Sequence, residues 1–487
     1  MTLTHVPVAP LPLARFQTVL DAPHWQELDD ARQRTEAALR GRVVWNVNST
    51  AFGGGVAEML RSLLAYARGA GVDARWVVLD GTPEFFRLTK RLHNRLHGHS
   101  GDGGPLGAAE QRTYEEVLRT SAADLHALAR PGDVVILHDP QTAGLIPALL
   151  DGVRVVWRSH IGRDGPDAHA DEAWAFLLPY LRAADGWIFS RREYVPPGLD
   201  PTRVTIVPPS IDAFTPKNQE LDGGAVLAIL HAAGLLGGPA PFSRPAFART
   251  DGTPGRVDRR ADLGGGDPIP AQAPWVTQVS RWDALKDPIG VLEGFVEHVA
   301  PSSDAHLILA GPAVEAVADD PEGAAMLTAV RVACDRLPPS VRSRVHLACL
   351  PMDDAEENAA IVNALQRRSD VVVQKSLAEG FGLTVGEAMW KRRPVVASAV
   401  GGIRDQIEDG ISGRLIEDPS DLRAFGEVVL DVLSDAARAE AMGAAAHERV
   451  RDHFLSSRHL VQYARLLGHL AGPDEPAAAV GAVAAKA

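Results

Sequence analysis

Residues 371–391 read VVVQKSLAEGFGLTVGEAMWK, and this stretch decides the fold that the sequence predicts. Its first four residues, Val371–Gln374, predict a buried β-strand, and residues 383–391 predict a helix. The glycines between them would let backbone N–H groups approach an anion at the positively polarised N-terminus of that helix. Glu379 would stand at the mouth of this seat, and Glu387 two turns into the helix. The stretch therefore predicts a strand–turn–helix unit of an α/β fold with a place for a phosphate group.

Strand-like runs alternate with helical patterns along most of the chain, which predicts parallel sheets covered by helices on both faces. Pro208 and Pro209 interrupt the alternation and separate two series of runs. Two such series predict an α/β fold with two Rossmann-like domains facing across a cleft, with ligands at the carboxyl ends of the strands. The strand candidates are 43–47, 76–79, 134–137, 153–157, 187–189 and 204–207 in the first series, and 275–279, 306–310, 345–349, 371–374, 394–398 and 414–416 in the second.

The length of 487 residues exceeds what one ordinary core supports, so more than one domain is expected. Residues 237–272 are rich in Gly, Pro, Asp and Arg, a composition that predicts a mobile surface insertion burying little apolar surface. We expect an N-terminal extension over 1–40 with one helix around 25–39. A first Rossmann-like domain would cover 41–212, and a second, which carries the insertion, 213–455. A helix over 456–471 would pack back on the first domain, and a disordered tail would cover 472–487.

The charge balance restricts the class of partner. Lys and Arg total 49 and Asp and Glu total 62, which gives a net charge of −13 and argues against a nucleic-acid partner. Cys334 and Cys349 lie beside apolar residues, so buried structural thiols in a reducing compartment are expected. The N-terminus has no basic stretch followed by an apolar core, and no apolar run is long enough to span a bilayer. These features predict a cytoplasmic protein that binds no membrane.

A second glycine cluster, Gly53–Gly55, follows the first strand candidate and opens the first helical pattern. Three consecutive glycines remove side chains from the loop and would let it lie against a ligand. The segment lacks the Lys-Ser/Thr pair of a P-loop, so nucleotide hydrolysis through that motif is disfavoured. The alternative is a tight strand–helix turn that binds nothing.

Arg281 and Lys286 lie five residues apart after the first strand candidate of the second series. A loop at a strand end can turn both cations toward one diphosphate, which would meet the planar fork of Arg and the compact charge of Lys. The alternative is that both are solvated surface cations. The sequence contains no Asp-x-Asp triplet, zinc pattern or nucleophile elbow, so no metal site is predicted.

Two polar segments, His138–Gln141 and Arg158–His160, end strand candidates of the first series. Side chains at strand ends can face a ligand crevice. Short polar groups of this kind suit sugar recognition, since each can bond one hydroxyl. The alternative for each is a role in capping or at the edge of the core.

Together these motifs resemble the retaining glycosyltransferases of the GT-B architecture, and most closely glycosyltransferase family 4. The resemblance rests on the Glu379 and Glu387 pair, on Arg281 with Lys286, on the first glycine loop and on the order of the two domains. It covers roughly residues 41–465, without the insertion. Further segments resemble the trehalose glycosyltransferring synthases within that family: 47–58, 84–90, 138–141, 208–212 and 278–281.

The resemblance implies that a nucleotide-sugar donor binds mainly to the second domain. Arg281 and Lys286 would neutralise the departing diphosphate in place of a metal ion. Glu379 would bond the 3- and 4-hydroxyls of the donor sugar, and Glu387 the ribose. The other implied donor-binding residues are Phe381 and Gly382, through their backbone N–H groups, Leu383, and Gly54 and Gly55, which would approach the diphosphate from the other side of the cleft.

The resemblance also assigns residues of the first domain to the sugars. His160 corresponds to a histidine that bonds the donor sugar near the reacting carbon. His138 and Asp139 would hold the acceptor glucose. Asn48, Glu84 and Lys90 are weaker acceptor candidates.

The reaction implied is the reversible formation of trehalose from a nucleoside-diphosphate glucose and free glucose, with retention of donor configuration and no cofactor. The leaving phosphate itself would take the acceptor proton. The expected partners are these sugars and trehalose, and a homodimer is a possible assembly. Two alternatives remain open: a retaining trehalose phosphorylase, and a nucleotide-sugar-binding protein without catalysis.

Overall fold

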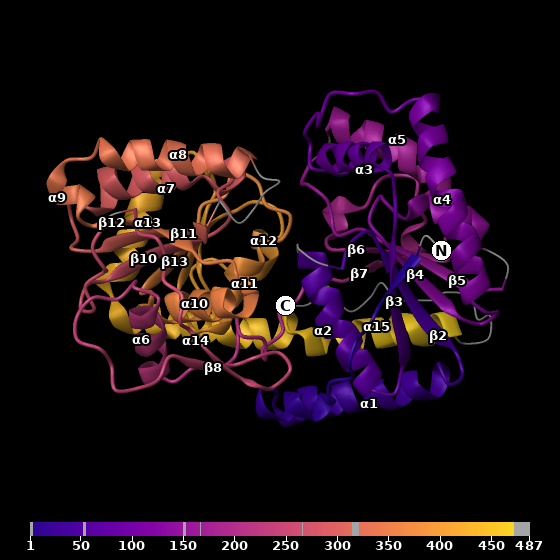
Figure 1. The fold of residues 1–487 in the computed structure, drawn as a ribbon, viewed down its shortest axis with the longest axis horizontal. Helices are drawn as coiled ribbons and strands as arrows, with labels where there is room; N and C mark the ends of the chain where they lie inside the picture. The colour runs from indigo at the N-terminus through magenta and orange to yellow at the C-terminus, as the bar shows by residue number, and fades with distance from the viewer. Residues whose placement is uncertain are drawn as a thin grey trace. The chain divides into compact units, whose positions relative to one another are not determined.

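The computed structural model describes residues 3–51, 55–149, 152–165, 167–264, 266–313 and 321–471. The chain divides into two compact units (Figure 1). The first unit consists of Met1–Ser210 and Ser456–Ala487, and the second of Ile211–Leu455. Gly53, Gly54 and the predicted tail over 472–487 lie outside the described residues.

The first unit is built on a sheet with the strand order β1-β3-β2-β4-β5-β6-β7. Every neighbouring pair is parallel except β1 and β3, which are antiparallel. The N-terminal residues are therefore part of the sheet, and the expectation of an extension with one helix misses this edge strand. The strands are β1 (Leu3–Val6), β2 (Val43–Asn48), β3 (Asp73–Leu79), β4 (Val134–His138), β5 (Arg154–Arg158), β6 (Gly186–Phe189) and β7 (Val204–Ile206).

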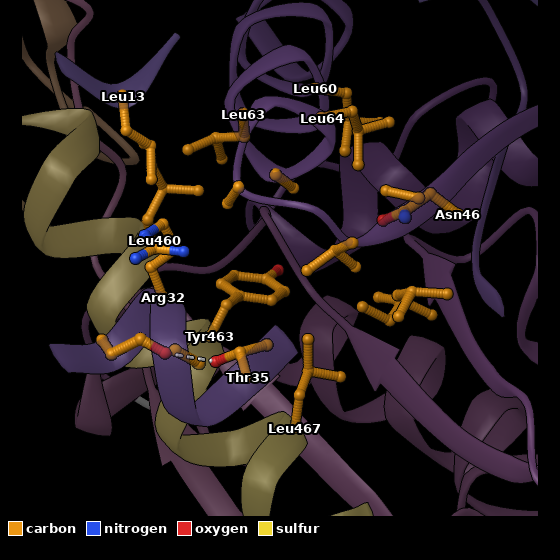
Figure 2. Close-up of a pocket in the computed structure, with 18 of the residues that line it drawn as sticks. Leu13, Arg32, Thr35, Asn46, Leu60, Leu63, Leu64, Leu460, Tyr463 and Leu467 are labelled. Atoms are coloured by element: carbon orange, nitrogen blue, oxygen red, sulfur yellow. Dashed lines mark hydrogen bonds between the residues drawn. The ribbon is translucent and has the colours of Figure 1, made fainter. Parts of the chain in front are cut away.

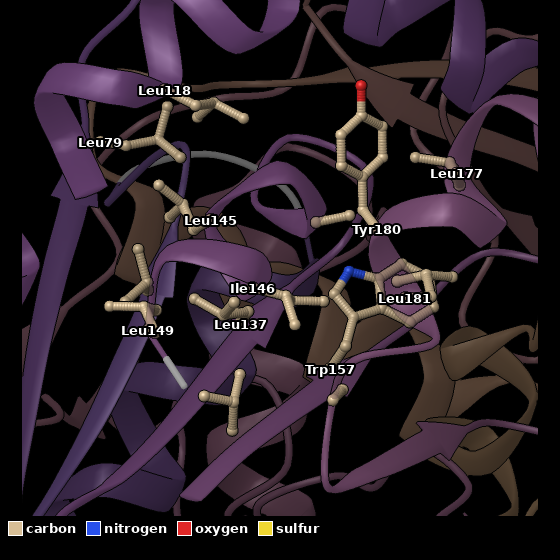
Figure 3. Packing of buried hydrophobic residues seen from close by; sticks show 14 of the residues in the cluster. Leu79, Leu118, Leu137, Leu145, Ile146, Leu149, Trp157, Leu177, Tyr180 and Leu181 are labelled. Carbon is tan, nitrogen blue, oxygen red and sulfur yellow. The ribbon is translucent and has the colours of Figure 1, made fainter. Parts of the chain in front are cut away.

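Helices cover both faces of this sheet because alternate strand residues are apolar on both sides. Val135 and Leu137 pack with α3, α4 and α5, in the core that Figure 3 shows. Val134 and Ile136 pack on the other face with α2 and α15. The helices are α1 (Ala22–Ala38), α2 (Gly55–Gly69), α3 (Pro83–Leu96), α4 (Ala108–Leu128), α5 (Ala168–Leu181) and α15 (Ser456–Ala471), with short 3-10 helices at Leu13–Thr18, Ala143–Ala148, Arg192–Tyr194 and Pro201–Arg203.

The second unit has a parallel sheet with the strand order β12-β11-β10-β13-β14-β15. This is the doubly wound order, in which the winding reverses between β10 and β13, and ligands bind at the carboxyl ends beside such a reversal. The strands are β10 (Trp275–Val279), β11 (His306–Pro312), β12 (Val345–Leu350), β13 (Val371–Gln374), β14 (Val395–Ser398) and β15 (Arg414–Ile416).

Helices also cover both faces of the second sheet. Leu307 and Leu309 of β11 pack with α7, α8 and α13, whereas Ile308 and Ala310 pack with α6 and α10. The helices are α6 (Gly223–Ala232), α7 (Pro288–Gly294), α8 (Pro321–Asp335), α9 (Pro339–Arg342), α10 (Ala355–Arg368), α11 (Leu383–Trp390), α12 (Ile403–Gln406), α13 (Leu422–Ser434) and α14 (Ala436–His453), with a 3-10 turn at Ala284–Lys286 and a π-helical turn at Phe295–Val299.

The segment 237–272 differs from its prediction. It forms a hairpin of β8 (Ala246–Ala248) and β9 (Pro254–Arg256), and Phe247 and Val257 are 6% and 1% exposed. Arg249 joins it to the N-terminus of α10 through Asp354 at 2.6 Å. The expectation that this segment buries little apolar surface is therefore wrong. Phe247, Val257 and Ile269 of this segment are buried, whereas Phe242 is exposed.

Both cysteines are buried, as the sequence predicts. Desolvation by burial raises the pKa of the Cys334 thiol to about 11. Within the described ranges, the helices include none with the length and apolar character needed to cross a bilayer.

Removing the aromatic ring of Phe247 tests the packing of the hairpin. Phe247→Ala should lower the free energy of unfolding by about 3 kcal/mol, because a buried ring is lost from a packed core. Phe242→Ala is the matched control in the same segment, since the Phe242 side chain is fully exposed, and it should change stability by less than about 0.5 kcal/mol. The midpoint of urea denaturation measures both, and equal effects would contradict the packing.

Candidate active site

The loops that follow β10 and β13 lie beside the reversal of the second sheet. The backbone N–H of Leu377, after β13, donates to the carbonyl of Leu285, after β10, at 2.8 Å. This bond holds the loop of Arg281 and Lys286 against the loop of Glu379. Two motifs that are far apart in the sequence thus lie together at the carboxyl ends of the neighbouring strands β10 and β13.

Lys286 and Glu379 form an ion pair at this edge. Their side chains are 18% and 11% exposed, so the pair is largely shielded from water. The carbonyl of Lys286 accepts a hydrogen bond from Gln278 Nε2 at 2.7 Å, which fixes the turn that carries the ammonium group. The structure therefore brings together the cation and the carboxylate that the sequence predicts for one donor.

Arg281 is on the same loop but is not in this pair. Its side chain is 69% exposed, and its Nη2 lies 3.2 Å from the Asp283 carboxylate. An exposed guanidinium with a nearby partner can swing toward an anion at low cost, because little contact is lost. The geometry also agrees with the alternative of a solvated surface cation.

A second ion pair, between Lys375 and Asp287, lies directly beneath these loops. The Lys375 side chain is 1% exposed. Asp287 has a left-handed backbone (φ 49°), and its carboxylate accepts from the Gly290 N–H at 3.0 Å at the start of α7. Sequence reasoning missed this pair. The signal was a lysine directly after a buried strand, a position where a charge requires a partner.

The glycine junction before α11 is shaped by close packing. Gly382 has a left-handed backbone (φ 83°), and a Cβ there would lie 3.0 Å from Ile403 and 3.2 Å from Glu379. Its carbonyl accepts from Gln406 Nε2 at 3.2 Å. Phe381 is buried and Leu383 is the first residue of α11. Only glycine fits this backbone, so the junction holds Glu379 at the N-terminal end of the helix.

Glu387 is buried in the second turn of α11, 3.7 Å from the ammonium of Lys217. Lys391, four residues later, donates to the carbonyl of Glu387 at 3.0 Å, and to Asn218 and Gln366 at 3.0 and 2.8 Å. Desolvation by burial lowers the pKa of Lys391 to about 7, opposed by the charge of Glu387. Sequence reasoning missed both lysines, although the spacing of four between Glu387 and Lys391 was a signal.

His138, Asp139 and His160 come together where β4 and β5 end in the first unit. The two imidazoles are stacked, with His138 Nδ1 3.0 Å from His160 Nε2. Asp139 has a left-handed backbone (φ 64°), and its carboxylate accepts from the His160 N–H at 2.8 Å. Asn46 of β2 joins the cluster, with Oδ1 3.1 Å from His138 Nε2. Sequence reasoning missed Asn46, which lies two residues before Asn48 and so on the same face of its strand.

Burial controls the charge of this cluster. Desolvation lowers the pKa of His138 to about 3 and that of His160 well below its usual value, and the positive charge of Arg158 adds to both shifts. Desolvation raises the pKa of Asp139 to about 7, against the opposing effects of the His160 N–H and of Arg158. At neutral pH the imidazoles are therefore neutral, a form that can bond sugar hydroxyls.

Three weaker candidates lie apart from these contacts. Asn48 uses its amide within the fold, accepting from Trp76 Nε1 at 2.8 Å and donating to the carbonyl of Thr50 at 2.7 Å. Glu84 pairs with Arg87 on the exposed side of α3, and Lys90 is exposed on the same helix. Gly55 begins α2, and its neighbour Gly54 lies outside the described residues. The roles of these residues stay predictions.

The described residues include no group of three or more His, Cys, Asp or Glu side chains placed to hold a metal ion.

Known proteins similar to this chain cover nearly all of it. Residues 46–196 match the family described as trehalose synthase, N-terminal domain, and residues 356–449 match glycosyl transferases group 1. Trehalose synthase from Pyrococcus horikoshii is 36% identical over 92% of this chain and 94% of its own length. Trehalose phosphorylase from Pleurotus pulmonarius is 26% identical over 83% of this chain and 54% of its own length.

The fold is also shared with solved structures. The UDP-forming α,α-trehalose-phosphate synthase from Burkholderia xenovorans is similar with a TM-score of 0.62 and 16% identity, over 89% of this chain and 100% of its own. The predicted α/β fold of two Rossmann-like units, the GT-B class, is confirmed. Its identity to trehalose synthases extends over almost its whole length, so this chain belongs to the trehalose synthase family of glycosyltransferases.

Proposed function

We propose that the protein makes trehalose from a nucleoside-diphosphate glucose and free glucose, reversibly and with retention of the donor configuration. The observation that carries the proposal is the shielded Lys286–Glu379 pair at the edge where the second sheet reverses. It sets a cation for a diphosphate and a carboxylate for sugar hydroxyls side by side. Trehalose synthase relatives over nearly the whole chain support the choice of product.

In this proposal the second unit holds the donor. The ammonium of Lys286 turns from Glu379 to the diphosphate, and the exposed Arg281 swings in from the same loop. Glu379 then accepts from hydroxyls of the glucosyl group. Glu387, in the next turns of the helix, accepts from the ribose. Cations that meet charge as it develops on the leaving group provide the largest share of the rate enhancement.

The first unit holds the sugars with neutral groups. His160 bonds the donor sugar near the reacting carbon, and His138 and Asp139 bond the acceptor glucose. The bond from the anomeric carbon to the phosphate oxygen breaks, and the acceptor oxygen bonds to that carbon on the same face. The acceptor proton passes to the departing phosphate oxygen, so no protein nucleophile takes part.

A retaining trehalose phosphorylase is the second candidate. It is favoured by the similarity to trehalose phosphorylase, which extends over 83% of this chain. Inorganic phosphate would then take the place of the nucleoside diphosphate between the same cations. That relative is the more distant one at 26% identity, against 36% for trehalose synthase, so we place the synthase first.

The phosphate-binding cations are tested by Lys286→Ala and Arg281→Ala. Each should lower kcat about 100- to 1000-fold, since losing one donor that stabilises developing negative charge costs that much. Trehalose formation at saturating substrates, followed by chromatography, gives kcat. Arg423→Ala is the matched control, because this residue lies on the exposed side of α13 and pairs with Glu427 of the same helix. Near-normal kcat in both variants would contradict the proposed roles.

The choice between synthase and phosphorylase is tested in the direction of trehalose breakdown. Trehalose is incubated with ADP, UDP or GDP in separate reactions, and with inorganic phosphate alone. We expect a nucleoside-diphosphate glucose from at least one nucleotide and no glucose 1-phosphate from phosphate. Release of glucose 1-phosphate by phosphate alone would establish the second candidate instead.

Metal removal is a third test. We expect trehalose formation to continue in EDTA, because Lys286 and Arg281 supply the positive charge that a metal would otherwise provide. Initial rates with and without the chelator measure this. Complete loss of activity that a divalent ion restores would contradict the expectation.

A further inference from the structure

Arg158, the last residue of β5, is a fully buried cation whose partners in the described part of the chain are neutral. Its Nε donates to His160 Nδ1 at 3.3 Å. Its Nη1 lies 2.9 Å from His459 Nε2 and bonds the hydroxyl of Tyr463, and its Nη2 lies 3.4 Å from the carbonyl of Val207. A buried guanidinium is costly, so its placement requires an explanation.

The guanidinium determines the direction of every hydrogen bond that follows it, because it can only donate. His160 must accept at Nδ1, so its proton lies on Nε2 and is donated to His138 Nδ1 at 3.0 Å. His138 in turn has its proton on Nε2 and donates it to Asn46 Oδ1 at 3.1 Å. One side chain thus fixes the same tautomer in both histidines.

Helix α15 holds the guanidinium from the other side. His459 accepts from Arg158 at Nε2, so its Nδ1 carries the proton and donates to Ser210 Oγ at 2.9 Å. The ring of Tyr463 lies under the guanidinium, with the cation 5.4 Å from the ring centre. Tyr463 also lines an apolar cavity of about 80 Å³ between α1, α2 and α15, which Asn46 borders too (Figure 2). The side of Arg158 that faces α15 therefore has fixed partners in low-dielectric surroundings.

We infer that Arg158, His459 and Tyr463 are positioning residues for sugar transfer: they hold His160 and His138 in the one neutral tautomer that carries its proton on Nε2. This inference rests on the proposed function. A sugar oxygen that replaces His138 Nδ1 as the acceptor of the His160 Nε2 proton must therefore offer a lone pair. At the far end of this series of hydrogen bonds, the buried Nδ2 of Asn46 has no partner in the described residues, and it offers a further donor.

The positive charges around the cluster also lower the pKa values of its histidines. Besides burial, the charge of Arg158 lowers the pKa of His138, His160 and His459. The other groups that face them are Arg458 of α15, whose charge also lowers the pKa of His459, and the carboxyl of Asp139. Loss of the Arg158 charge should therefore raise the histidine pKa values in part, because the desolvation that lowers them most remains.

The tautomers can be observed without any activity. Protein labelled with ¹⁵N-histidine is studied by NMR between about pH 8 and 5, and signals are assigned with His138→Gln and His160→Gln. We expect both rings in the wild type to keep an unprotonated Nδ1 and a protonated Nε2 throughout. In Arg158→Met, His160 Nδ1 loses its donor, so both rings should show a mixture of the two neutral tautomers. A wild type with protonated Nδ1 on His160, or with rings that titrate normally, would overturn the inference even if the protein makes trehalose.

If Arg158→Met does not fold, milder substitutions in α15 test the positioning role in its place. Tyr463→Phe removes one acceptor of the guanidinium, His459→Leu removes another, and His459→Gln restores an acceptor oxygen. Tyr180→Phe is the matched control: it loses a hydroxyl contact with Glu115 at 2.8 Å on the opposite face of the sheet.

The readout is the pH dependence of kcat, together with KM for glucose. Tyr463→Phe and His459→Leu should lower kcat about tenfold or more at pH 7 through misplaced contacts, and because both keep the Arg158 charge, neither should add a loss of rate at low pH. His459→Gln should recover most of kcat, and Tyr180→Phe should keep the wild-type pH profile. No difference in kcat between His459→Leu and His459→Gln would overturn the positioning role. If no variant and no wild type makes trehalose, the proposed function fails while the NMR result still decides the tautomers.

Discussion

A parallel sheet whose two faces are covered by helices has room for polar side chains only at the ends of its strands. This constraint applies to both units. Residues inside β4 and β13 are fully buried between helix layers. Polar side chains are found where those strands end, at His138 and Gln374 and in the loops that follow. The strand order therefore determines which loops meet, and so which polar side chains lie close together.

Arg158 differs from other buried cations of this chain in the partners that it has. In the second unit each buried lysine has an oxygen partner from a carboxylate, amide or carbonyl: Lys375 meets Asp287, and Lys391 meets Asn218, Gln366 and the Glu387 carbonyl. In the first unit, Arg95 and Arg191 likewise pair with carboxylates, of Glu172 and Asp164. Arg158 bonds neutral side chains instead. A cation paired with a carboxylate can exchange that partner for an anionic ligand, whereas a cation among neutral acceptors mainly orients them.

The parts of the site that could be predicted are those that the local sequence determines. The strand–glycine–helix order around Gly382 and the polar residues ending β4 and β5 are visible in short windows, because alternation and glycine position are local signals. The pairs Lys375–Asp287 and Arg158–His459 join residues 88 and 301 positions apart. Only packing decides such pairs. The hairpin of segment 237–272 was missed for a similar reason: composition averages over a window, and two buried side chains, Phe247 and Val257, do not change the average.

The path of the chain through the first unit has a consequence for the order of events during synthesis. The chain leaves this unit at Ser210 and returns to it at Ser456. A domain generally folds as its residues emerge from the ribosome, but β5 cannot bury the guanidinium of Arg158 against His459 and Tyr463 until residues 211–455 have been translated. During that interval the guanidinium must stay hydrated, and the surface that α15 will cover must stay open. Completion of the contacts around His138 and His160 is therefore tied to the translation of α15, the last helix of this unit to be made.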